Sequence, residues 1–157
     1  MKVKPSDREA FSRMAPGVLT AGGFLGTDTR PPEEIIAEDE AAFARLGLDF
    51  DQVAQELAQL AEEGSKGLGE PIKVRNLLVQ AGDARGMLSC PWNDGLFHKT
   101  AVSLRPADLP PGACVEGEDM LVYSELSIHL LKAHHFCQGL GSPFRLAPGL
   151  IAELLEK

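Results

Sequence analysis

The feature that most constrains the fold is a change of hydrophobic period at a glycine-rich joint, residues 64–69. Before the joint, apolar residues recur at helical spacing, whereas after it short apolar or mixed runs alternate with turn residues. Helices gathered in one part of the chain and strands in another are typical of the α+β class. The joint is short for an interdomain linker. We therefore expect a single α+β domain over residues 1–157, with a helical part at about 32–63 and the sheet and C-terminal helix at about 72–157.

The helical part has the pattern of a hairpin. Pro31 and Pro32 suit a helix start, and Gly47 supplies a stop, so the first helix should run to about Leu46. A second start follows at Asp49, which stands at capping-box spacing from Gln52, and an amphipathic stripe then continues to Gly64.

The second part has the pattern of an antiparallel meander of three to four strands. The expected strands are Ile72–Ala81, Met87–Trp92, Leu96–Leu104 and Met120–Tyr123, with turn-rich segments at 82–86 and 93–95. A helix should begin near Ser124, and Pro148 can open a short last helix to Glu156. We expect the hairpin and the Ser124 helix to pack on the same sheet.

Composition excludes several classes of function. The 157 residues carry a net charge of −8, which disfavours nucleic acid and anionic membranes as partners. No apolar run approaches the length of a membrane span, and residues 1–10 are charged, so a cytoplasmic protein is expected. A chain of this length needs no metal or disulfide to fold. The three cysteines form no CxxC pair.

The densest chemistry lies in residues 128–137, which hold three of the four histidines and Cys137. On a continuous helix, His129 lies about 140° from His134 and about 120° from His135, so the three rings cannot meet at one ion. Pairs remain open: Glu125 with His129, or His134 with Cys137.

Either pair would need ligands from another segment, for which Cys90, His98 and Cys114 are candidates. Of the pairs, Glu125 and His129 are our candidate metal ligands. The competing interpretation places His129 at the edge of the core with Glu125 as its partner, and His134 and His135 in solvent. Because the helix scatters the three histidines, the ligand spacing matches no established zinc pattern and the chain needs no structural ion, we expect no tightly bound zinc and no cofactor.

Asp39 is a second candidate functional residue. It projects from the middle of the apolar stripe of the first hairpin helix, among Ile35, Ile36, Phe43 and Leu46. An unpaired carboxylate is costly to bury, so Asp39 should be buried with a cationic or hydrogen-bonding partner. Arg30 and Arg145, both in loops that contain proline, are weak candidates for anion binding.

Cys90 is the third candidate, and its role depends on the register of the hairpin around Trp92–Leu96. A type I turn with Gly95 as a bulge would set Cys90 opposite His98, which we favour. A two-residue Asp94-Gly95 turn would set it opposite Lys99 instead. Either neighbour, if cationic, would lower the pKa of the thiol.

The leading functional expectation is a small, non-catalytic cytoplasmic binding protein. Between Glu33 and Glu63 there are ten acids and one base, Arg45, which offers a surface to a protein or small-molecule partner. The alternative is a metal- or thiol-dependent enzyme that uses Glu125, His129 and Cys90 or Asp39 in a cleft between hairpin and sheet. The oligomeric state is left open.

Overall fold

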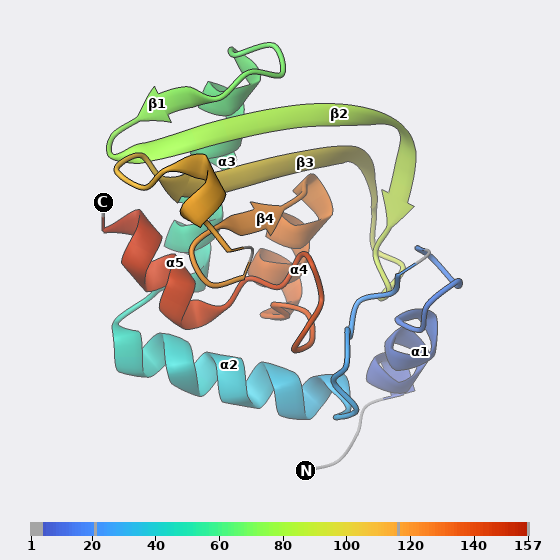
Figure 1. Ribbon diagram of the computed structural model, residues 1–157. Helices are drawn as coiled ribbons and strands as arrows, with labels where there is room; N and C mark the ends of the chain where they lie inside the picture. Colours follow the sequence, from blue (N-terminus) through green and yellow to red (C-terminus); the bar gives the residue numbers. More distant parts are fainter. Residues whose placement is uncertain (1–4, 21, 116, 157) are drawn as a thin grey trace.

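The computed structural model describes residues 5–20, 22–115 and 117–156. Within this range the elements are α1 (Pro5–Arg13), α2 (Pro32–Leu46), α3 (Phe50–Ser65), β1 (Ile72–Val74), β2 (Leu77–Ser89), β3 (Leu96–Pro106), η1 (Pro111–Ala113), β4 (Leu121–Tyr123), α4 (Glu125–His134) and α5 (Pro148–Leu155). The strands form one antiparallel sheet in the order β1-β2-β3-β4 (Figure 1). The α+β prediction is confirmed.

The β2–β3 hairpin is much longer than its neighbours in the sheet. β1 pairs only with residues 77–79, and β4 pairs only with residues 102–104. The far part of the hairpin, residues 83–100, is therefore a two-stranded extension, which we call the distal arm. Figure 1 shows it bending away from the sheet towards α1.

One expected turn is wrong. Residues 82–86 do not separate two strands but lie within β2, where the pairing shifts between Asp83 and Met87. Glycine at position 86, with φ +105°, accommodates this irregularity. The chain reverses earlier, between β1 and β2, where Arg75 has φ +56°.

The helix signals in the sequence correspond to real caps. The side chain of Asp49 accepts hydrogen bonds from the amides of Asp51 and Gln52 at the start of α3. Ser124 and Ser127 form a reciprocal capping box at the start of α4. Gly47 ends α2 in the left-handed conformation. These starts and stops lie where the sequence predicts them.

The helices form two layers beneath the sheet. α3 packs on β2 and β1, and α4 packs on β3 and α3. α2 contacts α5 and α1, so it lies mainly outside the layer that touches the sheet (Figure 1). Of the predicted hairpin, α3 is the helix that packs on the strands.

Buried apolar residues form two clusters. The main core lies between the sheet and α3, α4 and α5, and includes Leu57, Leu104 and Tyr123. The second cluster, which we call the distal core, lies under the distal arm and joins it to α1, α2 and α4. Its buried members are Ala10, Met14, Phe24, Ile35, Cys90, Leu126, Leu130 and Phe136. The helix α1, which the sequence analysis did not predict, contributes Ala10, and Met14 follows directly after its last residue.

Candidate metal centre

Four side chains with metal-ligating atoms converge where the tip of the distal arm meets the C-terminal half of α4. They are Cys90, Asp94, His129 and His134, and their ligand atoms all lie within 4.8 Å of one another. We call this group the Cys-Asp-His-His cluster. Two ligands come from the hairpin tip and two from α4, so the cluster joins segments that are distant in sequence.

The tip of the arm places Cys90 and Asp94 by a proline-directed turn. Cys90 precedes Pro91, and its carbonyl accepts a hydrogen bond from the amide of Asn93 at 2.9 Å. Proline suits the second position of such a turn because its φ is already fixed. The Cys90 amide then donates to the Gly95 carbonyl at 3.1 Å, which closes the loop and brings Asp94 back towards Cys90.

This turn makes both predicted registers of Cys90 wrong. Met87 faces His98 and Ser89 faces Leu96, while Cys90 lies at the start of the loop opposite Gly95. The chain does not form the expected turn centred on Asn93 and Asp94. It forms a turn over residues 90–93 instead, in which proline at position 91 occupies the favoured second position. His98 is exposed on the arm and lies opposite Met87, so it is not the cross-strand neighbour of Cys90.

Both histidines of the cluster point the same nitrogen at Asp94. His129 Nε2 lies 2.9 Å from Asp94 Oδ1, and His134 Nε2 lies 2.7 Å from Oδ2. Because a carboxylate only accepts, each imidazole donates from Nε2. Cys90 Sγ lies 3.7 Å from the same Nε2 of His134.

The helical wheel predicted that the three histidines diverge, and this is wrong for one pair. His129 and His134 converge although they are about 140° apart on an ideal helix, and their ring centroids are 5.4 Å apart. A wheel describes the directions of the Cα–Cβ bonds, whereas the Nε2 atoms lie farther out and follow the side-chain rotations. His135 does diverge: it caps α4 in the left-handed conformation and pairs with Glu40 at 2.8 Å.

Aromatic rings hold both imidazoles. Trp92 stacks on His134 with ring centroids 4.2 Å apart, and Phe97 lies tilted against His129 at 4.5 Å. Phe136 packs edge-on against Trp92. His134 is thus half-buried under the hairpin tip, not solvated as the competing interpretation expected, and the partner of His129 is Asp94 instead of Glu125.

The protonation states of the cluster follow from burial and hydrogen bonding. Burial, and then the hydrogen bond with Asp94, raise the pKa of the Cys90 thiol to about 12. Burial alone would raise the pKa of Asp94, but hydrogen bonds from Cys90, His129 and His134 lower it to about 2. Without a metal, the cluster at neutral pH is a thiol and a carboxylate anion.

This geometry differs from that of a nucleophilic triad. In a triad, the imidazole contacts the nucleophile through one nitrogen and the orienting carboxylate through the other. Here Nε2 of His134 faces both Cys90 and Asp94. The thiol is also fully buried, and its raised pKa opposes thiolate formation. Donor atoms that converge on one point suit an ion.

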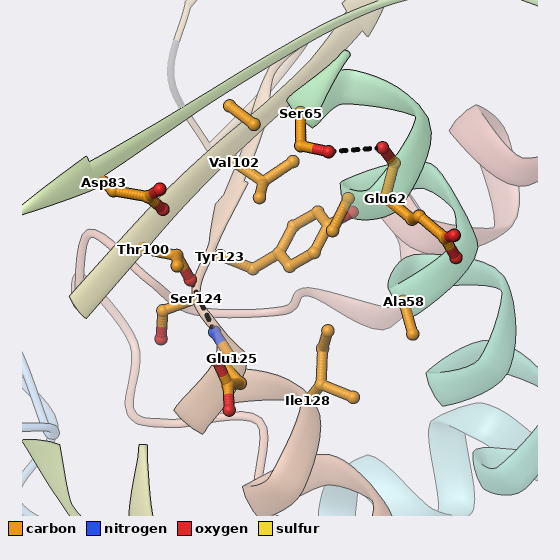
Figure 2. A pocket seen from close by; sticks show the side chains of 12 residues that line it. Ala58, Glu62, Ser65, Asp83, Thr100, Val102, Tyr123, Ser124, Glu125 and Ile128 are labelled. Carbon is orange, nitrogen blue, oxygen red and sulfur yellow. Dashed lines mark hydrogen bonds between the residues drawn. The ribbon is translucent and has the colours of Figure 1, made fainter. Parts of the chain in front are cut away.

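The predicted metal ligand Glu125 lies elsewhere. It is the first residue of α4 and is exposed, and its amide donates to Thr100 Oγ1 at 3.1 Å. Its side chain lines a mostly apolar cavity of about 270 Å³ between α3, the sheet and α4 (Figure 2). Figure 2 shows Asp83 and Glu62 on other sides of this cavity. The convergent cluster contains His129 but not Glu125.

Asp39 is buried and paired, as predicted. Arg145 donates to its two carboxylate oxygens at 3.0 and 2.9 Å, and also to the Gln138 carbonyl at 2.7 Å. This bidentate pair fastens α2 to the segment between α4 and α5. Asp39 and the nearby Cys137 therefore stand apart from the cluster at the hairpin tip.

Sequence reasoning missed Asp94 and the pairing of His134 with His129. Asp94 was interpreted only as a turn residue, and the one available signal was its position four residues after Cys90 in a segment with Pro91.

None of the described helices has both the length and the apolar character needed to cross a membrane. No protein family, curated protein or solved structure matches this chain.

Proposed function

We propose that the protein is a zinc-binding protein whose ion is held by Cys90, Asp94, His129 and His134. The observation that carries the proposal is the convergence of four donor atoms within 4.8 Å of one another. Two short segments supply them, and both are anchored in the distal core. A bound ion would fasten the hairpin tip to α4.

The donor set selects the metal. One sulfur, two imidazole nitrogens and one carboxylate oxygen suit zinc, whereas magnesium and calcium prefer oxygen ligands only. Zinc bond lengths of about 2.0–2.3 Å place a sulfur and a nitrogen ligand about 3.5 Å apart on a tetrahedron. The distance from Cys90 Sγ to His134 Nε2, 3.7 Å, is close to this value.

The two histidine–aspartate distances are those of hydrogen bonds, and tetrahedral ligation would widen them to about 3.3 Å. Binding also requires each Nε2 to give up its proton, either by a change of tautomer or to solvent, and the Cys90 thiol to lose its own. Asp94 lies on a turn, where a shift of about half an ångström requires only small changes in backbone and side-chain torsions.

This proposal reverses the expectation of no bound zinc. That expectation rested on the scatter of the three histidines around one helix. His129 and His134 need no help from His135, because the hairpin tip supplies the other two donors. The chain's length still removes any need for zinc in folding.

The acidic hairpin receives less support as a partner surface. Glu38 pairs with Arg30, Asp39 with Arg145, and Glu40 with His135. Acids that are paired within the molecule contribute less to an external field. The thiol-dependent form of the enzyme alternative also loses support, because Cys90 is buried and protonated.

The test is to load the metal-free protein with cobalt(II), which replaces zinc in such sites and absorbs visible light. We expect one equivalent to bind, with intense d–d bands of tetrahedral cobalt and a thiolate-to-cobalt charge-transfer band in the near ultraviolet. Zinc should displace the cobalt, and metal analysis after mild chelation should find about one zinc per chain.

Matched variants identify the ligands. Cys90→Ser should remove the charge-transfer band, and His134→Ala should weaken binding by at least about tenfold. Cys114→Ser and His98→Ala change the same residue types outside the cluster and should leave both spectra and stoichiometry unchanged. Absence of any thiolate band in the unaltered protein would refute the proposal.

A further inference from the structure

The four donors of the cluster differ sharply in their access to solvent. Cys90 is fully buried, and the side chains of His129 and His134 are 19% and 17% exposed. The side chain of Asp94 is 39% exposed. Solvent therefore reaches the cluster on the side where the carboxylate stands.

The donors also differ in how firmly zinc would retain them. The thiolate and both imidazoles come from buried or ring-stacked side chains, whose positions are fixed by the distal core, Trp92 and Phe97. Asp94 follows Asn93, which has φ +60°, in the loop of the hairpin tip, and it belongs to neither apolar cluster. The most exposed of the four donors is the ligand that can leave while the three more buried donors keep their positions.

If Asp94 leaves, the remaining set is one cysteine and two histidines with an open position. Three protein ligands plus an exchangeable fourth are the arrangement of catalytic zinc sites, whereas four fixed protein ligands are the arrangement of structural sites. We propose that Asp94 is an exchangeable ligand and that a small anion from solvent takes its place on the metal. This inference rests on the zinc-binding function proposed above.

The exchange replaces one metal–oxygen bond with one bond to the incoming anion. The bond between the metal and an Asp94 oxygen breaks, and a bond between the metal and the incoming anion forms, with no oxidation or reduction. If water were to enter instead, it would take the open position with both of its protons, and the released Asp94 carboxylate would remain an anion beside the metal.

The test uses azide as the small anion and the full chain loaded with cobalt(II). In the unaltered protein, azide should shift the d–d bands in a saturable manner while the thiolate charge-transfer band persists, since Cys90 stays bound. In Asp94→Ala the position is already open. If Asp94 occupies it in about nine molecules of ten, azide should bind this variant about tenfold more tightly.

A second variant closes the position. Asp94→His supplies a third imidazole, a stronger zinc ligand than a carboxylate, and should make the d–d bands insensitive to azide. Zinc-loaded protein should show the same order of azide affinities in competition with cobalt-loaded protein.

The outcomes separate the two proposals. In one outcome, the thiolate band persists but azide does not shift the d–d bands of either the unaltered protein or Asp94→Ala. This outcome would overturn the exchange and leave the zinc-binding proposal intact. Equal azide affinity in the unaltered protein and Asp94→Ala would show that Asp94 is no ligand and overturn the exchange as well. Loss of the thiolate band itself would overturn both proposals.

Discussion

At the scale of single residues, the environment of Cys90 decides between two chemistries. A thiol serves as a nucleophile when it is exposed and its pKa is lowered, and as a latent metal ligand when it is buried beside other donors. Cys90 is fully buried, and burial together with the hydrogen bond to Asp94 raises its pKa to about 12. A bound metal ion would favour the thiolate and so oppose this rise in pKa.

We therefore predict that Cys90 of the metal-free protein resists alkylation. With iodoacetamide at neutral pH, Cys114, which is partly exposed, should be labelled first, and Cys90 and the buried Cys137 only slowly. Mass spectrometry of peptides gives the three rates. His98→Ala should leave them unchanged, because His98 faces Met87. Faster labelling of Cys90 than of Cys114 would favour the thiol-enzyme hypothesis.

Asp94 gives a prediction about acid stability. Its pKa falls from 3.8 to about 2 in the folded protein because hydrogen bonds from Cys90, His129 and His134 outweigh the effect of burial. A depressed pKa stabilises the fold above the unfolded value and loses that contribution as pH falls through the folded value. The contribution of Asp94 should thus be full above about pH 4 and vanish towards pH 2.

The measurement is urea unfolding of the metal-free protein at several pH values, compared with Asp94→Asn. Because Asp28 also has a lowered pKa, held by its hydrogen bonds to Arg30, only the difference between the two proteins reports on Asp94. That difference should shrink as the pH falls from 4 to 2. A constant difference would mean that Asp94 makes no favourable charged contact.

At the scale of elements, two groups of polar side chains join segments that are distant in sequence. One is the Cys-Asp-His-His cluster between the hairpin tip and α4. The other is the buried pair of Asp39 on α2 with Arg145, in the segment that precedes α5. The side chains of Asp39 and Arg145 are only 5% and 14% exposed, so each depends on the other.

We predict that Arg145→Met destabilises the fold by about 3–5 kcal/mol, because it leaves the Asp39 carboxylate buried without a cation. The double variant Asp39→Leu, Arg145→Met should recover much of this loss, since no charge then remains buried. Urea unfolding provides both values. If the single and double variants lose the same free energy, the carboxylate is not the cause.

The bounds of α2 and α3 and the start of α4 could be predicted from the sequence because their signals are local, whereas α1 and the extent of β2 were not predicted. Asp49 and Ser124 cap helices through residues two or three positions away, and Gly47 ends a helix by its own conformation. The sites depend on contacts between distant residues. Asp94 meets His129 across 35 positions and Asp39 meets Arg145 across 106, separations at which periodicity carries no information.

The prediction that Asp39 is buried and paired was confirmed and the one for the metal ligands was incomplete, and the difference has a physical reason. A carboxylate in the apolar stripe of a helix demands a partner, so burial and pairing of Asp39 could be foreseen, although the identity of Arg145 could not. The geometry of the candidate metal centre depends on which four residues form one turn. Pro91 moved that turn by two positions relative to the expected one, and with it the place of Cys90.

At the scale of the whole molecule, the centre sits over one of two cores. Cys90 is a member of the distal core, which also holds Ala10 and Met14 from α1 and its end. Arg13 donates a hydrogen bond to the Pro91 carbonyl, inside the loop that carries Cys90 and Asp94. The main core, between the sheet and α5, contains no residue of the cluster. Ligation should therefore stabilise one side of the protein more than the other.

Our last prediction follows from this asymmetry. Zinc that binds the folded chain at about 100 times its dissociation constant should raise the free energy of unfolding by about 2.7 kcal/mol. Some amides exchange hydrogen for deuterium through local openings that need less free energy than global unfolding. Zinc should slow this exchange most at the hairpin tip, the end of α4 and α1, because these segments share the distal core. Amides of α5 should change little. The same exchange pattern in His98→Ala, and no zinc response in Cys90→Ser, would tie the effect to the cluster. Equal protection of α5 and α1 would instead mean that the two cores open as one unit, and that the ion secures the whole fold and not its distal half.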